Sequence, residues 1–217
     1  MKVRAVYEKG DRVRFLGHLD VSRCIQLALR RAKWPVEMSQ GFSPRPKLSV
    51  YAPLPVGVAG LREHFDAVLG GRPDIGTLAR AFAVSLPEGF VLHELYPMGD
   101  EETPFEESIR ASSYFVDMKG VKRETVKHAL EAFLEAPQVL FDVRRPKRTK
   151  RVDLKPFVLG VGEPEEADNG RVVLDMVISH DKGRTVRPQW IISSLGEFGL
   201  DFDPREAIID RRKIIFG

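Results

Sequence analysis

Hydrophobic residues in this chain switch several times between the spacing of a strand and the spacing of a helix, and this order limits the possible folds. Val3 to Tyr7 alternates like a strand with one buried face. From Leu19 to Trp34, apolar side chains recur three and four residues apart, which predicts an amphipathic helix that Pro35 ends. Its apolar positions are Val21, Cys24, Ile25, Ala28, Leu29 and Ala32.

The rest of the N-terminal half adds further strands and one more helix. Gly10 and Asp11 predict a turn, after which Val13 to Phe15 resumes the strand, so the chain opens with a strand or a short hairpin. Strands are predicted at 48–54, 63–69 and 90–96, and a helix at 75–86. The resulting order, β-α-β-β-α-β, is that of the ferredoxin-like arrangement.

A short acidic stretch divides the chain. Residues 99–108 hold five acidic side chains, a proline and no basic side chain, which is typical of a linker. After it, strands are predicted at 113–118, 138–143, 171–179 and 207–216, helices at 122–134 and 188–198, and an edge strand or short helix at 152–161, because Pro156 disfavours a central strand. We therefore predict an α+β protein with two tandem ferredoxin-like units, at 1–98 and 111–217, joined by an acidic linker at 99–110.

Charge is unevenly distributed, although the formal net charge is only +3. Residues 1–60 carry eleven Lys and Arg against four acids, whereas residues 61–120 carry five against eleven. This pattern indicates an N-terminal surface that faces a polyanion or a partner of matching charge. A solvated face of mixed charge is the alternative.

Several classes of site are excluded or disfavoured. Cys24 is the only cysteine, so this chain alone forms no disulfide and no multi-thiolate metal or iron–sulfur site. Its place on the apolar helix face predicts a core residue rather than a nucleophile. His64 and Asp66 share a strand face but are a weak metal signal, and we expect no metal. P-loop, dinucleotide-binding, HExxH and nucleophile-elbow motifs are absent.

The sequence also predicts the cellular location. No apolar run approaches the roughly 18 residues of a membrane span, and the N-terminal residues alternate rather than form a signal-peptide core. We expect a soluble, cytoplasmic protein with no membrane partner.

The first candidate site lies where the opening strand meets the first helix. The first N–H groups of a helix are unpaired and attract anions, so His18, after Gly17, can act as a general acid or base or donate to a phosphate. Alternatively, His18 packs beneath the loop as a structural residue. Asp20 and Arg23 form either a surface ion pair or a pair in which Asp20 orients Arg23 or His18. The catalytic candidates are His18, Asp20 and Arg23.

The same helix predicts a charged strip. A rotation of 100° per residue places Asp20, Arg23, Arg30 and Arg31 within one arc of roughly 100° beside the apolar face. We take Gly17, His18, Arg23, Arg30 and Arg31 as candidates for binding substrate or RNA. A solvated helix face is the alternative.

The loop at 39–47 is the second candidate. Pro44 and Pro46 fix two φ angles and push the residues before them into extended conformations. A stiff loop that carries cations beside Phe42 suits single-stranded RNA or flat substrates, although a plain crossover loop can have this composition. The binding candidates are Ser39, Gly41, Phe42, Arg45 and Lys47.

The third candidate is a basic segment in the second half. Six of the eight residues at 144–151 are Lys or Arg, which suits a phosphate-binding or partner-docking loop better than a core element. A disordered surface loop is the alternative. The candidates are Arg144, Arg145, Lys147, Arg148, Lys150 and Arg151, together with Arg187 at the start of the last predicted helix.

Several of these motifs, taken together, resemble those of a known family, the bacterial radical-SAM-linked proteins, a domain of unknown function. The residues that carry the resemblance are Phe15-x-Gly17-His18-x-Asp20-x-x-Arg23, Arg31-Ala32-x-x-Pro35, Ser39-x-Gly41-Phe42-x-Pro44-x-Pro46, Pro53-Leu54-Pro55-x-Gly57, Arg151-Val152-Asp153 and Arg187-Pro188. The family occurs beside, or as the C-terminal part of, a radical S-adenosylmethionine protein. The resemblance implies such a partner in trans but no residue roles.

Two functions are compatible with these observations. The first is a non-catalytic accessory or substrate-recognition protein for a radical SAM enzyme, binding RNA or a ribosome-linked substrate through its basic surface. This chain lacks the CxxxCxxC motif, so the iron–sulfur cluster and S-adenosylmethionine are expected only in the partner. The second is an RNA-processing or RNA-modifying enzyme that uses His18 or Asp20 as acid or base, an expectation that rests on fold analogy alone.

Overall fold

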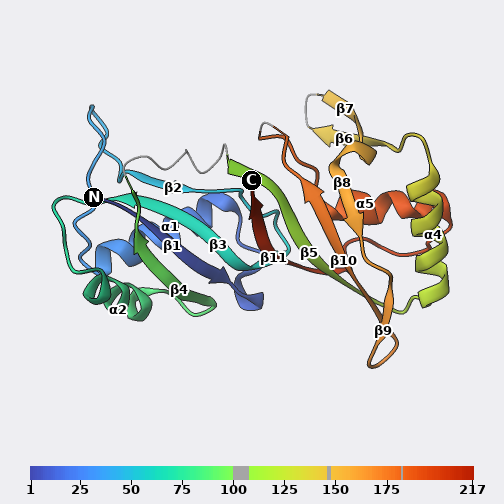
Figure 1. Ribbon diagram of the computed structural model, residues 1–217, viewed down its shortest axis with the longest axis horizontal. Helices are drawn as coiled ribbons and strands as arrows, with labels where there is room; N and C mark the ends of the chain where they lie inside the picture. The colour runs from blue at the N-terminus through green and yellow to red at the C-terminus, as the bar shows by residue number, and fades with distance from the viewer. Residues whose placement is uncertain (100–107, 146–147, 182) are drawn as a thin grey trace. The chain divides into compact units, whose positions relative to one another are not determined.

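The computed structural model describes residues 1–99, 108–145, 148–181 and 183–217. The chain folds into two compact units, Met1–Ser108 and Ile109–Gly217 (Figure 1). Each unit combines helices with an antiparallel sheet, so the predicted α+β class is confirmed. Most of the predicted linker, residues 100–107, lies outside the described residues, and its role stays a prediction.

Unit 1 is a four-stranded sheet with two helices. In chain order its elements are β1 (Lys2–Lys9), the 3-10 helix η1 (Asp11–Val13), α1 (His18–Arg31), β2 (Leu48–Val50), β3 (Val58–Val68), α2 (Ile75–Ser85) and β4 (Phe90–Pro97). The strand order is β4-β1-β3-β2, and each neighbouring pair is antiparallel. A crossover helix therefore separates strands that are not neighbours in the sheet, as in split β-α-β units.

The unit 1 core forms where the apolar helix faces meet one face of the sheet. Val21, Ile25, Ala28 and Leu29 of α1 are buried, as the helical spacing predicts, and Cys24 is partly buried against the same core. The rings of Trp34 and Phe82 lie 5.2 Å apart, and those of Phe65 and Phe82 5.6 Å apart. These tilted and edge-on contacts add to the free energy gained by burying the rings.

The segment after β1 differs from the prediction. Val13 to Phe15 does not resume a strand, because Asp11–Val13 is a 3-10 helix. The buried Lys9 ammonium donates hydrogen bonds to the Arg14 carbonyl at 2.8 Å and the Val58 carbonyl at 3.0 Å, which draws this segment against the start of β3. A buried lysine needs such acceptors to offset its lost hydration, a demand that hydrophobic spacing does not reveal.

Unit 2 repeats this strand order with additions. Its elements are β5 (Ile109–Lys119), α4 (Arg123–Glu135), β6 (Leu140–Arg145), β7 (Arg148–Asp153), η2 (Lys155–Phe157), β8 (Val158–Val161), β9 (Glu165–Ala167), β10 (Arg171–Ser179), α5 (Pro188–Ser194), η3 (Leu195–Phe198) and β11 (Ile208–Phe216). The main sheet runs β11-β5-β10-β8, with β9 also paired to β10, while β6 and β7 form a separate two-stranded ribbon.

Two unit 2 segments differ from the predicted boundaries. The predicted element at 152–161 is divided between the end of β7, the η2 turn that contains Pro156, and β8. The predicted helix at 188–198 changes from α to 3-10 geometry at Leu195 and ends before Gly199, whose φ of +93° is the left-handed conformation that favours glycine.

One buried carboxylate joins three parts of unit 1. Asp66 on β3 is 3% exposed and accepts two hydrogen bonds from the Arg4 guanidinium on β1, at 2.7 and 3.0 Å. Tyr51 follows β2, and its hydroxyl donates to the same carboxylate at 3.0 Å. The Lys2 ammonium lies 3.1 Å from Asp66 Oδ2. Asp66, considered with His64 as a weak metal signal, is therefore part of an ion-pair network.

Removing this carboxylate should destabilise unit 1 strongly. We expect Asp66→Ala to lower the free energy of unfolding by about 3–5 kcal/mol, because the buried Arg4 guanidinium loses its counter-charge. Urea unfolding followed by circular dichroism measures the change. Glu88→Ala, which breaks the exposed Arg12–Glu88 ion pair, is the control and should leave the midpoint almost unchanged. Equal shifts in the two variants would contradict this role for Asp66.

Tyr51 should titrate late. Burial, the negative charge of Asp66 and the hydrogen bond to Asp66 together raise the pKa of Tyr51 to about 12. The stabilisation linked to its protonated form is complete below the unfolded value of about 10 and is lost as pH rises through about 12. A titration of phenolate absorbance should show a late ionisation step, and Tyr51→Phe should reduce its amplitude by one tyrosine. A common midpoint near 10 in the folded protein would refute this.

Candidate nucleic-acid interface

The β6–β7 ribbon divides the predicted basic segment between two faces. In its register, Phe141 lies opposite Val152 and Val143 opposite Lys150, so Lys150 shares a face with Phe141. Arg144 and Arg151 lie on the other face, opposite Thr149 and Asp142. Apart from residues 146–147, which lie outside the described residues, the segment predicted to be one basic loop is therefore a two-stranded ribbon with cations on both faces.

An aromatic stack holds the ribbon against the start of α5. The rings of Phe141 and Trp190 are stacked, with centroids 5.7 Å apart and an angle of 20° between their planes. The Arg187 guanidinium lies over the Trp190 ring at 5.7 Å. Arg187 is exposed and precedes Pro188 at the first position of α5, where proline fits the helix start. The structure thus brings Arg187 to the same surface as the basic segment.

Not every cation of this ribbon is available to a ligand. The Asp142 carboxylate accepts two hydrogen bonds from Arg151, at 2.8 and 3.2 Å, which raises the pKa of Arg151 and lowers that of Asp142. Within residues 108–145, 148–181 and 183–217, the exposed side chains of Arg144 and Lys150 make no hydrogen bond or ion pair. Arg145 and Arg148 are the last backbone pair of the ribbon, and Lys147 lies outside the described residues.

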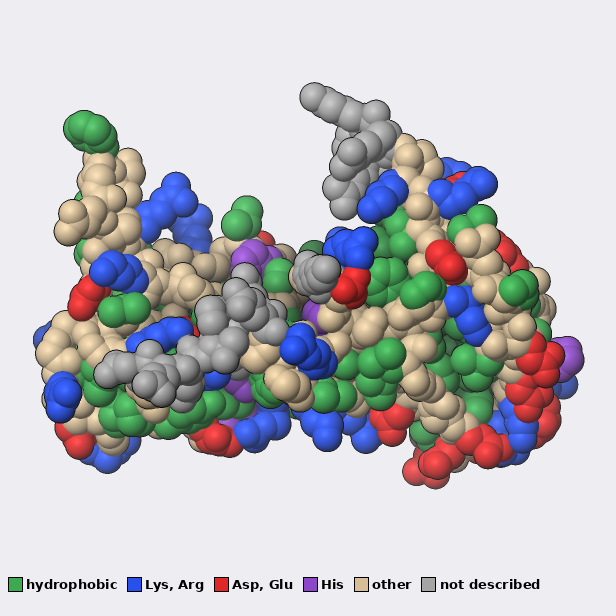
Figure 2. Space-filling view, turned by 45° about the horizontal axis from the view of Figure 1, so that its top comes forward, with side chains coloured by type: hydrophobic (Ala, Val, Ile, Leu, Met, Phe, Trp, Pro, Cys, Tyr) green, Lys and Arg blue, Asp and Glu red, His purple; other side chains and the backbone are tan. Residues whose placement is uncertain are grey.

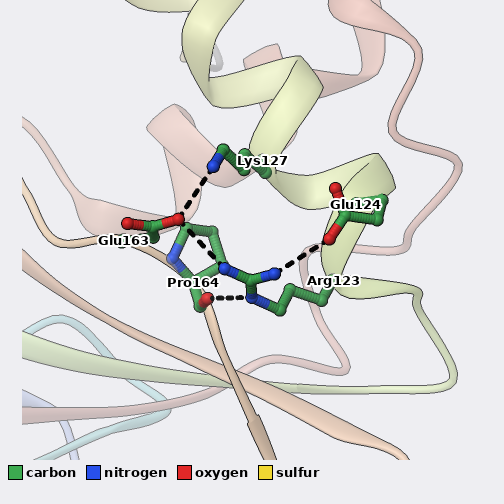
Figure 3. A network of polar contacts seen from close by, with 5 residues as sticks. All are labelled: Arg123, Glu124, Lys127, Glu163 and Pro164. Atoms are coloured by element: carbon green, nitrogen blue, oxygen red, sulfur yellow. Dashed lines mark hydrogen bonds and ion pairs between the residues drawn. The ribbon is translucent and has the colours of Figure 1, made fainter.

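Lys and Arg side chains gather over the ribbon in the space-filling view (Figure 2). Other cations of unit 2 are already neutralised by acids. Glu163 accepts from Lys127 at 2.8 Å and from Arg123 at 2.9 Å, and Arg123 also donates to the Pro164 carbonyl (Figure 3). This network attaches α4 to the loop before β9, and it lowers the pKa of Glu163. The unpaired cations of the ribbon are therefore distinct from these structural ones.

A serine–histidine pair in unit 2 does not form a nucleophilic site. Ser112 Oγ and His180 Nε2 lie 3.0 Å apart, and burial, with the nearby Arg211 charge, lowers the pKa of His180 to about 4. Ser112 is fully buried in β5, however, so no substrate reaches its hydroxyl. We interpret the pair as a satisfied core contact.

The first candidate site in unit 1 lies at the start of α1. Gly17 is the N-cap and His18 the first helical residue, one residue before the predicted start at Leu19, and a 3-10 turn rather than a strand precedes them. A small, open hollow with room for about one water molecule lies beside His18, and its polar walls come from Tyr7, Lys9, Tyr51 and Glu63. Lys9 and Glu63 are only 1% and 2% exposed, and sequence analysis did not identify either.

The charged side chains of α1 are all exposed. They are Asp20, Arg23, Arg30 and Arg31. Among residues 1–99, no hydrogen bond or ion pair links His18 with Asp20 or Arg23, so the proposed orienting role of Asp20 has no contact to support it. A Cβ on Gly17 would lie 3.5 Å from Asp20 Oδ2, which places this carboxylate over the helix start.

The loop at 39–47 begins at the opposite end of the sheet from His18. Its root pairs with Val68, whose amide donates to the Lys47 carbonyl, whereas the hollow beside His18 lies at Glu63. Five residues of β3 separate these positions, or roughly 17 Å at about 3.4 Å per residue. The structure therefore does not unite the two N-terminal candidate segments in one site.

The described residues form neither a metal-ion site nor a membrane-spanning helix. Among the described residues, no group of three or more His, Cys, Asp or Glu side chains is arranged to hold a metal ion. In the same part of the chain, no helix is long and apolar enough to cross a membrane.

The sequence-based expectations can now be compared with known proteins. A search of curated proteins found no match. Among solved structures, one similar chain comes from a "Crystal Structure of a Cbf5-Nop10-Gar1 Complex", with 11% sequence identity and a TM-score of 0.51. The match covers 98% of this chain and 48% of that chain, so this protein spans about half the length of that relative. At this identity the likeness concerns the fold alone.

A protein-family description matches most of the chain. It is that of an "Uncharacterized protein conserved in bacteria (DUF2344)", and it covers residues 2–188. The matched range includes unit 1 from Lys2 onward and extends through the ribbon to the first residue of α5. The chain therefore belongs to this uncharacterized bacterial family.

Proposed function

We propose that this protein is an RNA-binding recognition protein that uses the β6–β7 ribbon and the start of α5. One observation carries the proposal: Arg187 lies over Trp190, Trp190 stacks on Phe141, and the exposed Lys150 shares the ribbon face of Phe141. Single-stranded nucleic acids are bound by aromatic or guanidinium planes that stack on bases, beside cations that attract phosphates.

The choice of RNA over an acidic protein rests on the aromatic stack. Exposed cations alone attract any polyanion, whereas the exposed Arg187 guanidinium, supported by the half-buried Trp190 ring, offers a planar group on which an unpaired base can stack. Bases within a duplex are already stacked on each other, so the expected ligand is unpaired RNA.

A radical SAM enzyme remains the proposed partner. Support comes from the sequence resemblance, and from a single cysteine that leaves this chain unable to hold the cluster itself. In this proposal the chain acts in the cytoplasm and presents RNA, or a ribosome-linked substrate, to a partner that carries the iron–sulfur cluster and S-adenosylmethionine. Two tandem ferredoxin-like units are the proposed architecture, supported by the strand orders β4-β1-β3-β2 and β11-β5-β10-β8.

A second candidate function is an RNA-modifying enzyme centred on His18. The observation that favours it is the hollow that His18 shares with the buried Lys9 and Glu63. Incubation of the purified protein with total cellular RNA separates the two functions. Cleavage or modification that disappears in His18→Ala would establish the enzyme and contradict the accessory role.

Replacing Trp190 should weaken RNA binding. We expect Trp190→Ala to raise the Kd for an oligouridine of about 12 nucleotides roughly 5- to 150-fold, because the Arg187 plane loses its support and one stacked base contributes about 1–3 kcal/mol. Trp190→Phe should retain most of the affinity, since it keeps an aromatic plane. Fluorescence anisotropy measures the Kd, and urea unfolding verifies that each variant is folded.

Lysine variants provide the matched control. Lys150→Ala should reduce the slope of log Kd against log salt by roughly 0.7, the value for one phosphate contact with a single strand. Lys119→Ala removes the same charge at the end of β5 that pairs with Arg171, far from the start of α5. This variant should leave the slope unchanged. Equal effects of the two variants, or no effect of Trp190→Ala in a folded protein, would contradict the proposed surface.

A further inference from the structure

The loop between α1 and β2 is an ordered projection, hereafter the Phe42 loop (residues 37–47). Met38 and Pro46 form a bridge, and the Ser39 amide donates to the Arg45 carbonyl at 2.7 Å. The Arg45 amide donates in turn to Ser39 Oγ at 3.0 Å. These contacts close the loop on itself.

An ion pair fixes the root of the Phe42 loop. The Glu37 carboxylate accepts a hydrogen bond from Lys47 Nζ at 2.8 Å, which lowers the pKa of Glu37. The backbone bonds of Glu37 and Lys47 to Val68 attach this root to β3. Lys47, a predicted RNA contact, is thus occupied in holding the loop. Among residues 1–99, the exposed Arg45 side chain makes no hydrogen bond or ion pair.

Phe42 projects into solvent from the tip of this loop. Its side chain is fully exposed, more so than any other large hydrophobic residue among those described. Gly41 has a φ of +127°, a conformation that favours glycine, and a Cβ there would meet nothing within 4 Å. The Phe42 ring therefore lies in solvent, and no other part of the described chain packs beside Gly41.

The small apolar surface of the Phe42 loop indicates which kind of ligand binds there. A stable protein interface buries more than about 1,000 Å² and surrounds its anchor residues with further contacts. Phe42 is flanked by Gly41 and Ser43 at the tip, and the other exposed apolar side chains of the loop are only Met38 and Pro44, so the apolar surface is far smaller than a protein interface needs. One ring with an unpaired cation in the same loop matches one unpaired base and its phosphate.

We propose that Phe42 is a second RNA contact, which stacks on an unpaired base while Arg45 faces the adjacent phosphate. The inference relies on the proposed function only for the identity of the ligand, because the Phe42 loop belongs to unit 1 and the ribbon to unit 2. The closed loop holds the ring exposed before binding, which reduces the conformational entropy lost when RNA is bound.

Variants at Phe42 distinguish stacking from general apolar contact. With the oligouridine of about 12 nucleotides, Phe42→Ala and Phe42→Leu should both raise the Kd roughly 5- to 150-fold. Phe42→Trp should keep the affinity or improve it, since it preserves a planar ring. The control is Val84→Ala on α2, which shortens another highly exposed apolar side chain and should change nothing.

The outcomes separate this inference from the proposed function. If Trp190→Ala weakens binding and Phe42→Ala does not, the Phe42 contact is refuted while the ribbon site stands. If Phe42→Leu binds as well as the wild type, stacking at Phe42 is refuted. If the wild-type protein binds no oligouridine at any salt concentration, both the ribbon site and the Phe42 contact are wrong.

Discussion

The contact between Phe141 and Trp190 determines where the basic ribbon lies. A two-stranded ribbon outside a larger sheet has little stability of its own, so it must be held by packing against the rest of its unit. The stack joins β6 to α5, and the Asp153 carboxylate accepts from the Val139 amide at 3.1 Å where the ribbon begins. Without these contacts, the cations of the ribbon would have no fixed relation to Arg187. The candidate interface therefore depends on an aromatic contact rather than on charge alone.

Buried charges have a different role in unit 1. Asp66 and Lys9 are both almost inaccessible to solvent, and each draws together segments that lie far apart in the sequence. Ions in such surroundings require close partners because their desolvation is costly, and this requirement specifies the position of the connections around the sheet. Residues 1–60 are basic overall, but part of that charge stabilises the fold. Only the exposed cations, such as Arg45 and those of α1, are available to a polyanion.

Hydrophobic spacing predicted the helices and strands that bury a regular apolar face. It failed where a single side chain determines the course of the backbone. The buried positions of α1 follow directly from the sequence, because a helix repeats every 3.6 residues. The 3-10 turn after β1 depends on acceptors for Lys9 that come partly from Val58, a long-range contact that no local pattern reveals. Trp190 was missed as well, although its spacing of three residues from Arg187 on a predicted helix was a usable signal. Separation of His18 from the Phe42 loop follows from which residues of β3 each segment meets, Glu63 and Val68, a long-range pairing that hydrophobic spacing does not reveal.

Ultraviolet crosslinking of the wild-type protein to a single-stranded RNA, with the modified peptides identified by mass spectrometry, tests the central claim most directly. It requires no substitution, so altered folding does not complicate the result. The account predicts crosslinks in peptides that contain Trp190 or Phe141, and their loss when salt is raised, because counterion release contributes to binding. Crosslinks confined to other surfaces, such as the acidic β9 strand, or none on the ribbon and α5, would contradict it.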